Sequence, residues 1–236
     1  MKAVILAADR GSRMKSLTDE RPKCMVELFG KPLLQWQLEA INEAGIREIG
    51  IVTGYKSDML ANYGLQVFKN TRWSETQMVT SLSCASEWLE KETCIVSYSD
   101  IFYGSDAVSK LMNEAADIAL TYDPNWRQLW TDRFGNPLLD AETFKLREDG
   151  KLLEIGNKPK TVEEIQGQYM GLLRFTPAGW AQVQNMRNKM NDEEKDRIHM
   201  TAIIQMLLCH RVDITALPYD GKWGEIDSIQ DLELYE

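Results

Sequence analysis

The fold is decided by residues 3–34, which read AVILAADRGSRMKSLTDERPKCMVELFGKPLL. The stretch opens with an apolar run at residues 3–8, which predicts a short buried strand. A polar loop with Gly11 and several basic side chains follows, and Pro32 then stands where a helix can begin. A strand that stops at a glycine-containing basic loop presents backbone N–H groups and cations to phosphates. The alternative interpretation is an ordinary strand-to-helix turn whose charged loop is simply solvated.

Strands and helices alternate through the first half of the chain. Apolar residues at helical spacing cover residues 32–44, Gly45 predicts the end of that helix, and residues 48–53 form a second apolar strand. A strand, a helix and a strand at this spacing predict parallel pairing in a βαβ unit. We expect the following elements next: a helix at 56–62, a strand at 65–68, a loop at 69–77, a helix at 78–89, a strand at 93–97, a helix at 105–115 and a strand at 117–122.

The pattern changes at residues 123–160, which are rich in aromatic and charged residues and lack a clear helical period. Two strand-like segments, 142–147 and 151–156, flank Glu148-Asp149-Gly150 and predict a hairpin. We interpret 123–160 as a small lobe beside the main sheet. Beyond it we expect a strand at 167–175, helices at 177–189 and 199–208, a strand at 213–217, and residues 223–227 ahead of a short terminal helix.

Composition limits the classes of function. A net charge of −9 argues against general nucleic-acid binding, which needs a basic face, but a few local cations suffice for a nucleotide. The four cysteines and two histidines show no zinc-ligand spacing, and the cysteines are predicted to be reduced. The apolar N-terminal run is too short for a signal peptide, and no segment approaches the roughly 20 apolar residues of a membrane span. We therefore predict a cytoplasmic protein without a membrane or nucleic-acid partner, and the oligomeric state, a homodimer included, stays open.

The opening stretch resembles the nucleotidyltransferase superfamily, whose members transfer a nucleoside monophosphate from an NTP to a phosphorylated acceptor. The matching positions are Leu6-Ala7-Ala8, Gly11, Arg13, Met14, Leu17, Thr18, Pro22, Lys23, Met25, Gly30, Lys31, Pro32, Leu33 and Leu34. The chain departs from the family pattern at Asp9, where the family usually has glycine close to the nucleotide. The resemblance implies an α/β fold, Rossmann-like, with a mostly parallel central sheet flanked by helices and a small acceptor-binding lobe. We expect one domain, 1–236, with a nucleotide-binding core at 1–122 and an acceptor-binding and metal-completing part at 123–236.

Two cations and two acids are the candidate residues for transfer chemistry. Arg13 and Lys23 suit phosphate oxygens, as a bidentate group and a compact charge respectively. Near the C-terminus the chain reads WGEIDSIQD, which resembles the phosphocholine cytidylyltransferase-like branch of the superfamily. In that branch a strand-end Asp and the Asp of this late segment bind the metal, which here implies Asp100, Asp227 and Mg²⁺. The alternative is that both acids cap helices.

The nucleotide base is expected against the backbone after the first strand and the loop before the helix at 78–89. Ala8, Gly11, Gln77 and Ser81 are the candidates, and the Gln77 amide offers both a donor and an acceptor to a pyrimidine edge. CTP as the nucleotide is implied by the family likeness alone.

The acceptor site is predicted from the aromatic and basic residues of the lobe. Trp126, Trp130 and Tyr169 can form a cage for a quaternary ammonium group, or the tryptophans can simply close the lobe. Arg127 and Arg133 suit an anionic acceptor, and Lys158 resembles the family lysine that contacts the acceptor phosphate, so it joins Arg13 and Lys23 as a catalytic candidate.

The sequence thus predicts a Mg²⁺-dependent cytidylyltransferase. It would join CTP to a small phosphate or phosphonate monoester and release pyrophosphate. Phosphocholine, 2-aminoethylphosphonate, 2-hydroxyethylphosphonate and a phosphorylated amino acid stay open as acceptors. One alternative is a sugar-1-phosphate nucleotidyltransferase, and another is an inactive nucleotide-binding regulatory module, which Asp9 favours.

Overall fold

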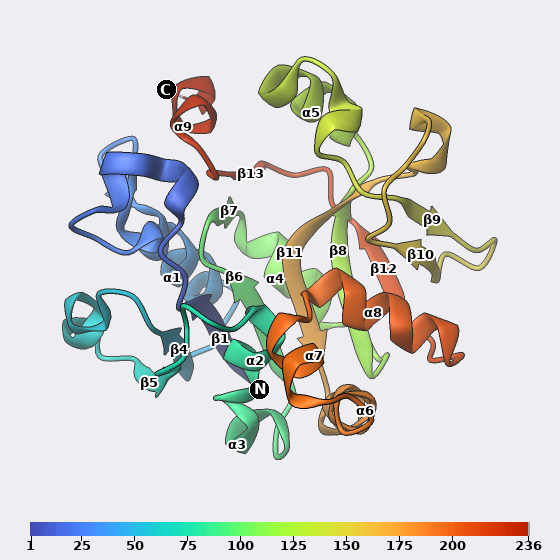
Figure 1. Cartoon of the computed structure of the whole chain (residues 1–236), viewed down its shortest axis with the longest axis horizontal. Helices are drawn as coiled ribbons and strands as arrows, with labels where there is room; N and C mark the ends of the chain where they lie inside the picture. Colours follow the sequence, from blue (N-terminus) through green and yellow to red (C-terminus); the bar gives the residue numbers. More distant parts are fainter. Residues whose placement is uncertain (236) are drawn as a thin grey trace.

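The computed structural model describes residues 1–235, and within them seven strands form one central sheet (Figure 1). The strand order is β12-β8-β11-β6-β1-β4-β5. Neighbouring strands pair in parallel except β11, which runs antiparallel to both β6 and β8. The predicted mostly parallel α/β sheet is therefore confirmed. The bounds of its strands are Lys2–Ala7 (β1), Ile49–Thr53 (β4), Gln66–Lys69 (β5), Cys94–Tyr98 (β6), Ile118–Asp123 (β8), Gln168–Phe175 (β11) and Thr215–Pro218 (β12).

Helices cover both faces of this sheet, which explains why central strands such as β1 and β4 are apolar and buried along nearly their whole length. Side chains alternate between the two faces of a strand, so Val4 packs in one core and Ile5 in the other. Helices α1 and α4 contribute to the core around Ile5, whereas α2, α6 and α8 contribute to the core around Val4 (Figure 1). The bounds of these helices are Leu33–Glu43 (α1), Met78–Ser83 (α2), Ser105–Met112 (α4), Pro177–Arg187 (α6) and Met200–Cys209 (α8). None of the helices in residues 1–235 is long and apolar enough to cross a bilayer.

A small antiparallel pair joins the C-terminal segment to the rim of the sheet. Strand β7 (Ile101–Tyr103) pairs with β13 (Trp223–Glu225), with Ile101 opposite Glu225. Helix α9 (Ile229–Tyr235) follows directly. This pairing was not predicted, and it carries the late acidic segment to the end of β6, where the candidate site lies.

The lobe after β8 contains the predicted hairpin, formed by β9 (Phe144–Leu146) and β10 (Leu152–Ile155). It also contains helix α5 (Trp126–Phe134), which was not expected. The helix buries mainly Trp126 and Trp130, four residues apart, and its other positions are largely polar. An apolar stripe this narrow gives almost no helical period, so the pattern of the sequence did not predict the helix.

Smaller differences concern the ends and breaks of elements. The helix expected at 78–89 is divided into α2 and α3 (Ser86–Leu89), and the segment at 56–62 is a 3₁₀ helix, Ser57–Tyr63. A further short helix, α7 (Asp192–Arg197), precedes α8 and begins with a capping box on Asn191. Further 3₁₀ turns span Ser12–Thr18, Lys23–Met25, Pro137–Leu139 and Val162–Glu164, and a two-residue pair joins Glu27–Leu28 (β2) to Lys31–Pro32 (β3).

Candidate active site

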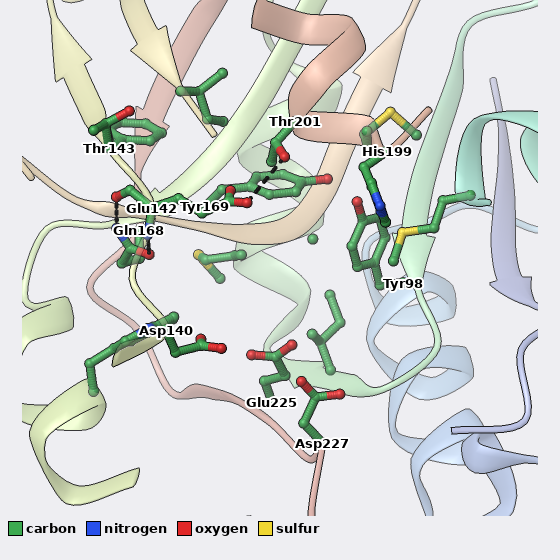
Figure 2. A pocket seen from close by; sticks show the side chains of 18 of the residues that line it. Tyr98, Asp140, Glu142, Thr143, Gln168, Tyr169, His199, Thr201, Glu225 and Asp227 are labelled. Atoms are coloured by element: carbon green, nitrogen blue, oxygen red, sulfur yellow. Dashed lines mark hydrogen bonds between the residues drawn. The ribbon is translucent and has the colours of Figure 1, made fainter. Parts of the chain in front are cut away.

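Three carboxylates converge where the first half of the chain meets the C-terminal segment. Asp100 follows β6, and the backbone N–H of Ile226 donates to its carbonyl oxygen at 2.9 Å. Asp100, Glu225 and Asp227 each bring a carboxylate oxygen to within 4.8 Å of the other two. Figure 2 shows Glu225 and Asp227 facing the same space. The strand pairing of β7 with β13 therefore builds an acidic cluster from residues more than 120 positions apart.

Two cations from the opening loop meet this cluster. The buried Lys23 ammonium donates to Asp100 Oδ2 at 2.7 Å and also to Asp227 Oδ1. The Arg13 guanidinium, which is largely exposed, lies 2.7 Å from Asp227 Oδ2. Gly11 makes room for this arrangement, because its φ is +69° and a Cβ there would lie 2.7 Å from Lys23 Cδ.

The ion pairs set the protonation states of the buried groups. Burial by itself lowers the pKa of Lys23, but the charges of Asp100 and Asp227 outweigh it and raise that pKa above its usual value. Burial likewise acts to raise the pKa of Asp227, and the nearby Lys23 reverses the shift and lowers it. The cluster therefore holds a protonated lysine and an ionised aspartate, which are the forms that phosphate and metal binding require.

A buried arginine fixes the C-terminal side of the cluster. Arg133 of α5 has a fully buried side chain and lies 2.7 Å from both Glu225 Oε2 and Asp231 Oδ1. Asp231 in turn accepts the backbone N–H groups of Asp227 at 2.9 Å and Ser228 at 2.8 Å. Burial and the charge of Asp227 still raise the pKa of Glu225, although Arg133 acts to lower it. The structure thus places Arg133 in an ion pair that positions the acids, not in an acceptor pocket.

The cluster lies between two pockets. The larger, of about 640 Å³, takes its lining from the opening loop, the segment before α2 and the end of β6, and Asp100 and Lys23 belong to it. The smaller, of about 320 Å³, lies under the lobe and includes Glu225 and Asp227 (Figure 2). Three residues line both pockets: Met78, Tyr98 and His199. A molecule in each pocket would meet the other at the carboxylates.

Most of the residues predicted to bind the nucleotide line the larger pocket. Ala8, Gln77 and Ser81 do so, and the Ser81 hydroxyl accepts a hydrogen bond from the Asn70 amide. Asp9, the departure from the family pattern, lines the same pocket and accepts the Arg10 N–H at 2.7 Å. Gly11 does not line the pocket. Its lack of a side chain leaves room for the Lys23 side chain to pass close by. The nucleotide roles of these residues stay predictions.

The residues predicted for the acceptor are divided by the structure. Trp130 and Tyr169 line the smaller pocket, and Tyr169 packs edge-on against Tyr98 at 5.7 Å between ring centroids. Trp126 is buried in the core and Arg127 is exposed, and neither lines the pocket.

Lys158 is also outside both linings. Its ammonium donates to the backbone oxygens of Leu138 at 2.5 Å and Leu139 at 3.0 Å. The structure therefore does not bring Lys158 to the carboxylates, and its role toward the acceptor stays a prediction.

Several lining residues were not predicted as site residues. Glu225 had a readable signal, because it stands two positions before Asp227 beside a strand and i, i+2 side chains share a face. Glu142, Gln168 and Thr201 had none, since they lie on separate segments that only the lobe brings together.

The cluster has the donor set of a hard divalent cation. All three ligands are carboxylate oxygens, and Asp100 Oδ1 is buried without a hydrogen-bond partner among the described residues. Mg²⁺ prefers such oxygens and shares them with substrate phosphates. The residues present therefore fit the predicted metal, whose binding stays a prediction.

Comparisons with known proteins agree with this geometry. Residues 3–162 match the model of the MobA-like NTP transferase domain. The chain belongs to this family. The predicted nucleotidyltransferase class of this NTP transferase is thereby confirmed, and with it the family resemblance of the opening stretch.

Individual relatives of the NTP transferase include two with cytidylyltransferase names. CTP:phosphoglutamine cytidylyltransferase of Campylobacter jejuni is 38% identical over 99% of this chain and 98% of its own length. Choline-phosphate cytidylyltransferase of Streptococcus pneumoniae is 32% identical, over 43% of this chain and 46% of its own. The solved inositol-1-phosphate CTP transferase from T. maritima superposes with a TM-score of 0.77 at 19% identity, covering 99% of this chain and 94% of that one. At that identity the structural likeness shows the fold.

Proposed function

We propose that this NTP transferase is a Mg²⁺-dependent cytidylyltransferase that transfers CMP from CTP to a small phosphorylated acceptor and releases pyrophosphate. The observation that carries the proposal is the cluster of Asp100, Glu225 and Asp227 between two pockets, with Lys23 and Arg13 beside it. The two relatives that are named cytidylyltransferases support CTP as the nucleotide.

The reaction needs positioning and charge neutralisation more than proton transfer. A phosphate oxygen of the acceptor attacks the α-phosphorus of CTP, forming one P–O bond while the bond to pyrophosphate breaks. Because the attacking oxygen is already an anion, no general base is required. Lys23 and Arg13 offset the negative charge that develops on the departing pyrophosphate. Mg²⁺, when bound, supplies further positive charge at the phosphates, and the three carboxylates hold it.

The pocket volumes support a small acceptor. The space under the lobe is about 320 Å³, about half that of the pocket assigned to CTP. Phosphorylated glutamine is the first compound to test, because the relative that matches over nearly the whole chain is named for it. Phosphocholine follows from the second relative, and sugar 1-phosphates test the alternative that the sequence left open.

The test is pyrophosphate release in the presence of Mg²⁺, with the four common NTPs crossed with these acceptors. We expect turnover with CTP and a small acceptor, its loss when EDTA removes the metal, and recovery on adding Mg²⁺. Turnover with a sugar 1-phosphate alone, or undiminished turnover in EDTA, would contradict the proposal.

The base preference has its own variant. If the Gln77 amide reads the pyrimidine edge, Gln77→Leu should raise the KM for CTP and leave the KM for the acceptor unchanged. Arg197, which lines the same pocket, offers a control in Arg197→Lys, whose charge is retained.

A further inference from the structure

The smaller pocket carries more negative than positive charge. Four carboxylates line it, from Asp140, Glu142, Glu225 and Asp227, against the single guanidinium of Arg13, which is paired with Asp227. Glu225 forms an ion pair with Arg133, which lies outside the pocket lining. Within residues 1–235, Glu142 has no ion-pair partner, and its carboxylate accepts one hydrogen bond, from Thr201 Oγ1 at 3.3 Å (Figure 2).

Glu142 is nevertheless held firmly. The side-chain amide of Gln168 makes two hydrogen bonds to the Glu142 backbone: its oxygen accepts from the Glu142 N–H at 3.2 Å, and its nitrogen donates to the Glu142 carbonyl at 2.7 Å (Figure 2). Gln168 is only 4% exposed, so this clamp is shielded from water. A clamped backbone fixes where the carboxylate can reach, which is a mark of a preorganised binding group.

A second buried group in the pocket lacks a partner. Trp130 is 4% exposed and lines the pocket, and its indole N–H makes no hydrogen bond to any described residue. A buried donor without a partner is costly, because it loses its hydrogen bonds to water and regains none. The pocket therefore offers a carboxylate without a counter-ion among the described residues, and the indole N–H, itself buried, supplies no donor to neutralise it.

We propose that the acceptor carries a protonated primary amine and that Glu142 binds it. This inference rests on the proposed function, since it describes the acceptor of that reaction. An ammonium group supplies both the positive charge and the N–H donors that a half-buried carboxylate lacks. A quaternary ammonium group supplies the charge without a donor, so it satisfies Glu142 less well.

The test uses acceptors that differ at one group. Phosphorylated glutamine is compared with its analogue that has hydrogen in place of the α-ammonium group, and phosphoethanolamine with propyl phosphate. For the wild-type protein we expect kcat/KM to favour the amine in each pair by about 10- to 100-fold. Glu142→Gln should remove most of that preference by lowering kcat/KM far more for the amine than for its amine-free analogue, and Glu142→Asp should retain part of it.

The control variant is Glu163→Gln, which changes an exposed carboxylate just beyond the lobe and outside the pocket. Melting temperatures confirm that each variant is folded. Binding of the same acceptors, measured by calorimetry with CMP and Mg²⁺ present, gives a readout that does not depend on turnover. Equal use or binding of the amine and its analogue by the wild-type protein would overturn the inference, as would an equal loss for both in Glu142→Gln.

The two proposals fail in different ways. If the protein neither binds CTP nor releases pyrophosphate with any acceptor, the proposed function is wrong. If CTP is consumed with amine-free acceptors as readily as with amines, the proposed function stands and the role of Glu142 is wrong.

Discussion

The two pockets of this NTP transferase are built in opposite ways. At the larger, the charged residues beside the carboxylate cluster come from the opening loop and a strand end, and Lys23 there is paired with Asp100 and Asp227. The smaller is assembled from the lobe, β11, the start of α8 and β13, and it leaves the Glu142 carboxylate without a counter-ion among the described residues. The charged groups proposed for phosphate chemistry are thus paired with one another within the chain. Glu142, proposed to select the acceptor, lacks such a partner among the described residues and would gain one from a bound ligand.

The largest effect on turnover should come from a change in the acidic cluster between the two pockets. Asp227→Asn removes a metal-ligand candidate and a partner of Lys23, so we expect kcat to fall by roughly 1,000-fold with every acceptor. Initial rates of pyrophosphate release measure the effect. The control is Asp58→Asn, which changes an exposed carboxylate that lines neither pocket, and it should behave as wild type. Unchanged turnover in Asp227→Asn would show that the acidic cluster is not needed for the reaction.

The ion pairs that join helix α5 to the C-terminal segment should dominate stability. Arg133→Met leaves the buried Asp231 and the partly exposed Glu225 without their cation, and breaking a buried pair costs about 3–5 kcal/mol. Urea unfolding measures the loss, and a titration of thermal stability with Mg²⁺ should show weaker metal binding. Arg127→Met on the exposed side of the same helix should change stability by less than about 0.5 kcal/mol. Equal stability of the two variants would mean that Arg133 does not hold α5 to the C-terminal segment.

The acceptor side should respond to pH. Burial, followed by the charge of Asp140, raises the pKa of Glu142 above its ordinary 4.5, while the hydrogen bond from Thr201 opposes the shift. Glu142 must be ionised to bind an ammonium group, so the preference for an amine acceptor should be small at acid pH and grow as pH rises above 4.5. His199, Glu225 and Asp227 also line the pocket, so the ratio of KM values for the amine and its analogue is the quantity to follow. That ratio should be independent of pH in Glu142→Gln, and a pH dependence that survives there would assign the titration to another group.

Substitution of Lys158 should have the smallest effect on kcat/KM. It tests whether the role implied by sequence resemblance or the observed position of the side chain is the better guide. The resemblance predicts a contact with the acceptor phosphate, whereas the structure places the ammonium on the backbone oxygens of Leu138 and Leu139. From that position we expect Lys158→Ala to change kcat/KM less than Glu142→Gln does. A larger loss, with Lys160→Ala as the neighbouring control, would show that the lobe moves Lys158 to the substrate during turnover.

The sequence by itself determined the α/β fold and the opening-loop cations that meet the acidic cluster. An apolar strand followed by a glycine-containing basic loop is a local pattern, and its geometry follows from chain connectivity and backbone sterics. Arg13, Lys23 and the position of Asp100 at a strand end could therefore be predicted without coordinates. Asp227 of the late acidic segment was predictable through resemblance, whereas Glu225, two residues before it, was not predicted.

Only the tertiary structure decided which lobe residues reach the acceptor pocket. Arg133 and Arg127 lie six positions apart on α5, yet one is fully buried in ion pairs and the other is exposed, because the helix packs one side on the C-terminal segment. The sequence gives that helix too narrow an apolar stripe to reveal which side faces inward. Glu142 and Gln168 meet because strand β11 enters the sheet beside β8, and such a long-range pairing depends on packing that no local pattern encodes.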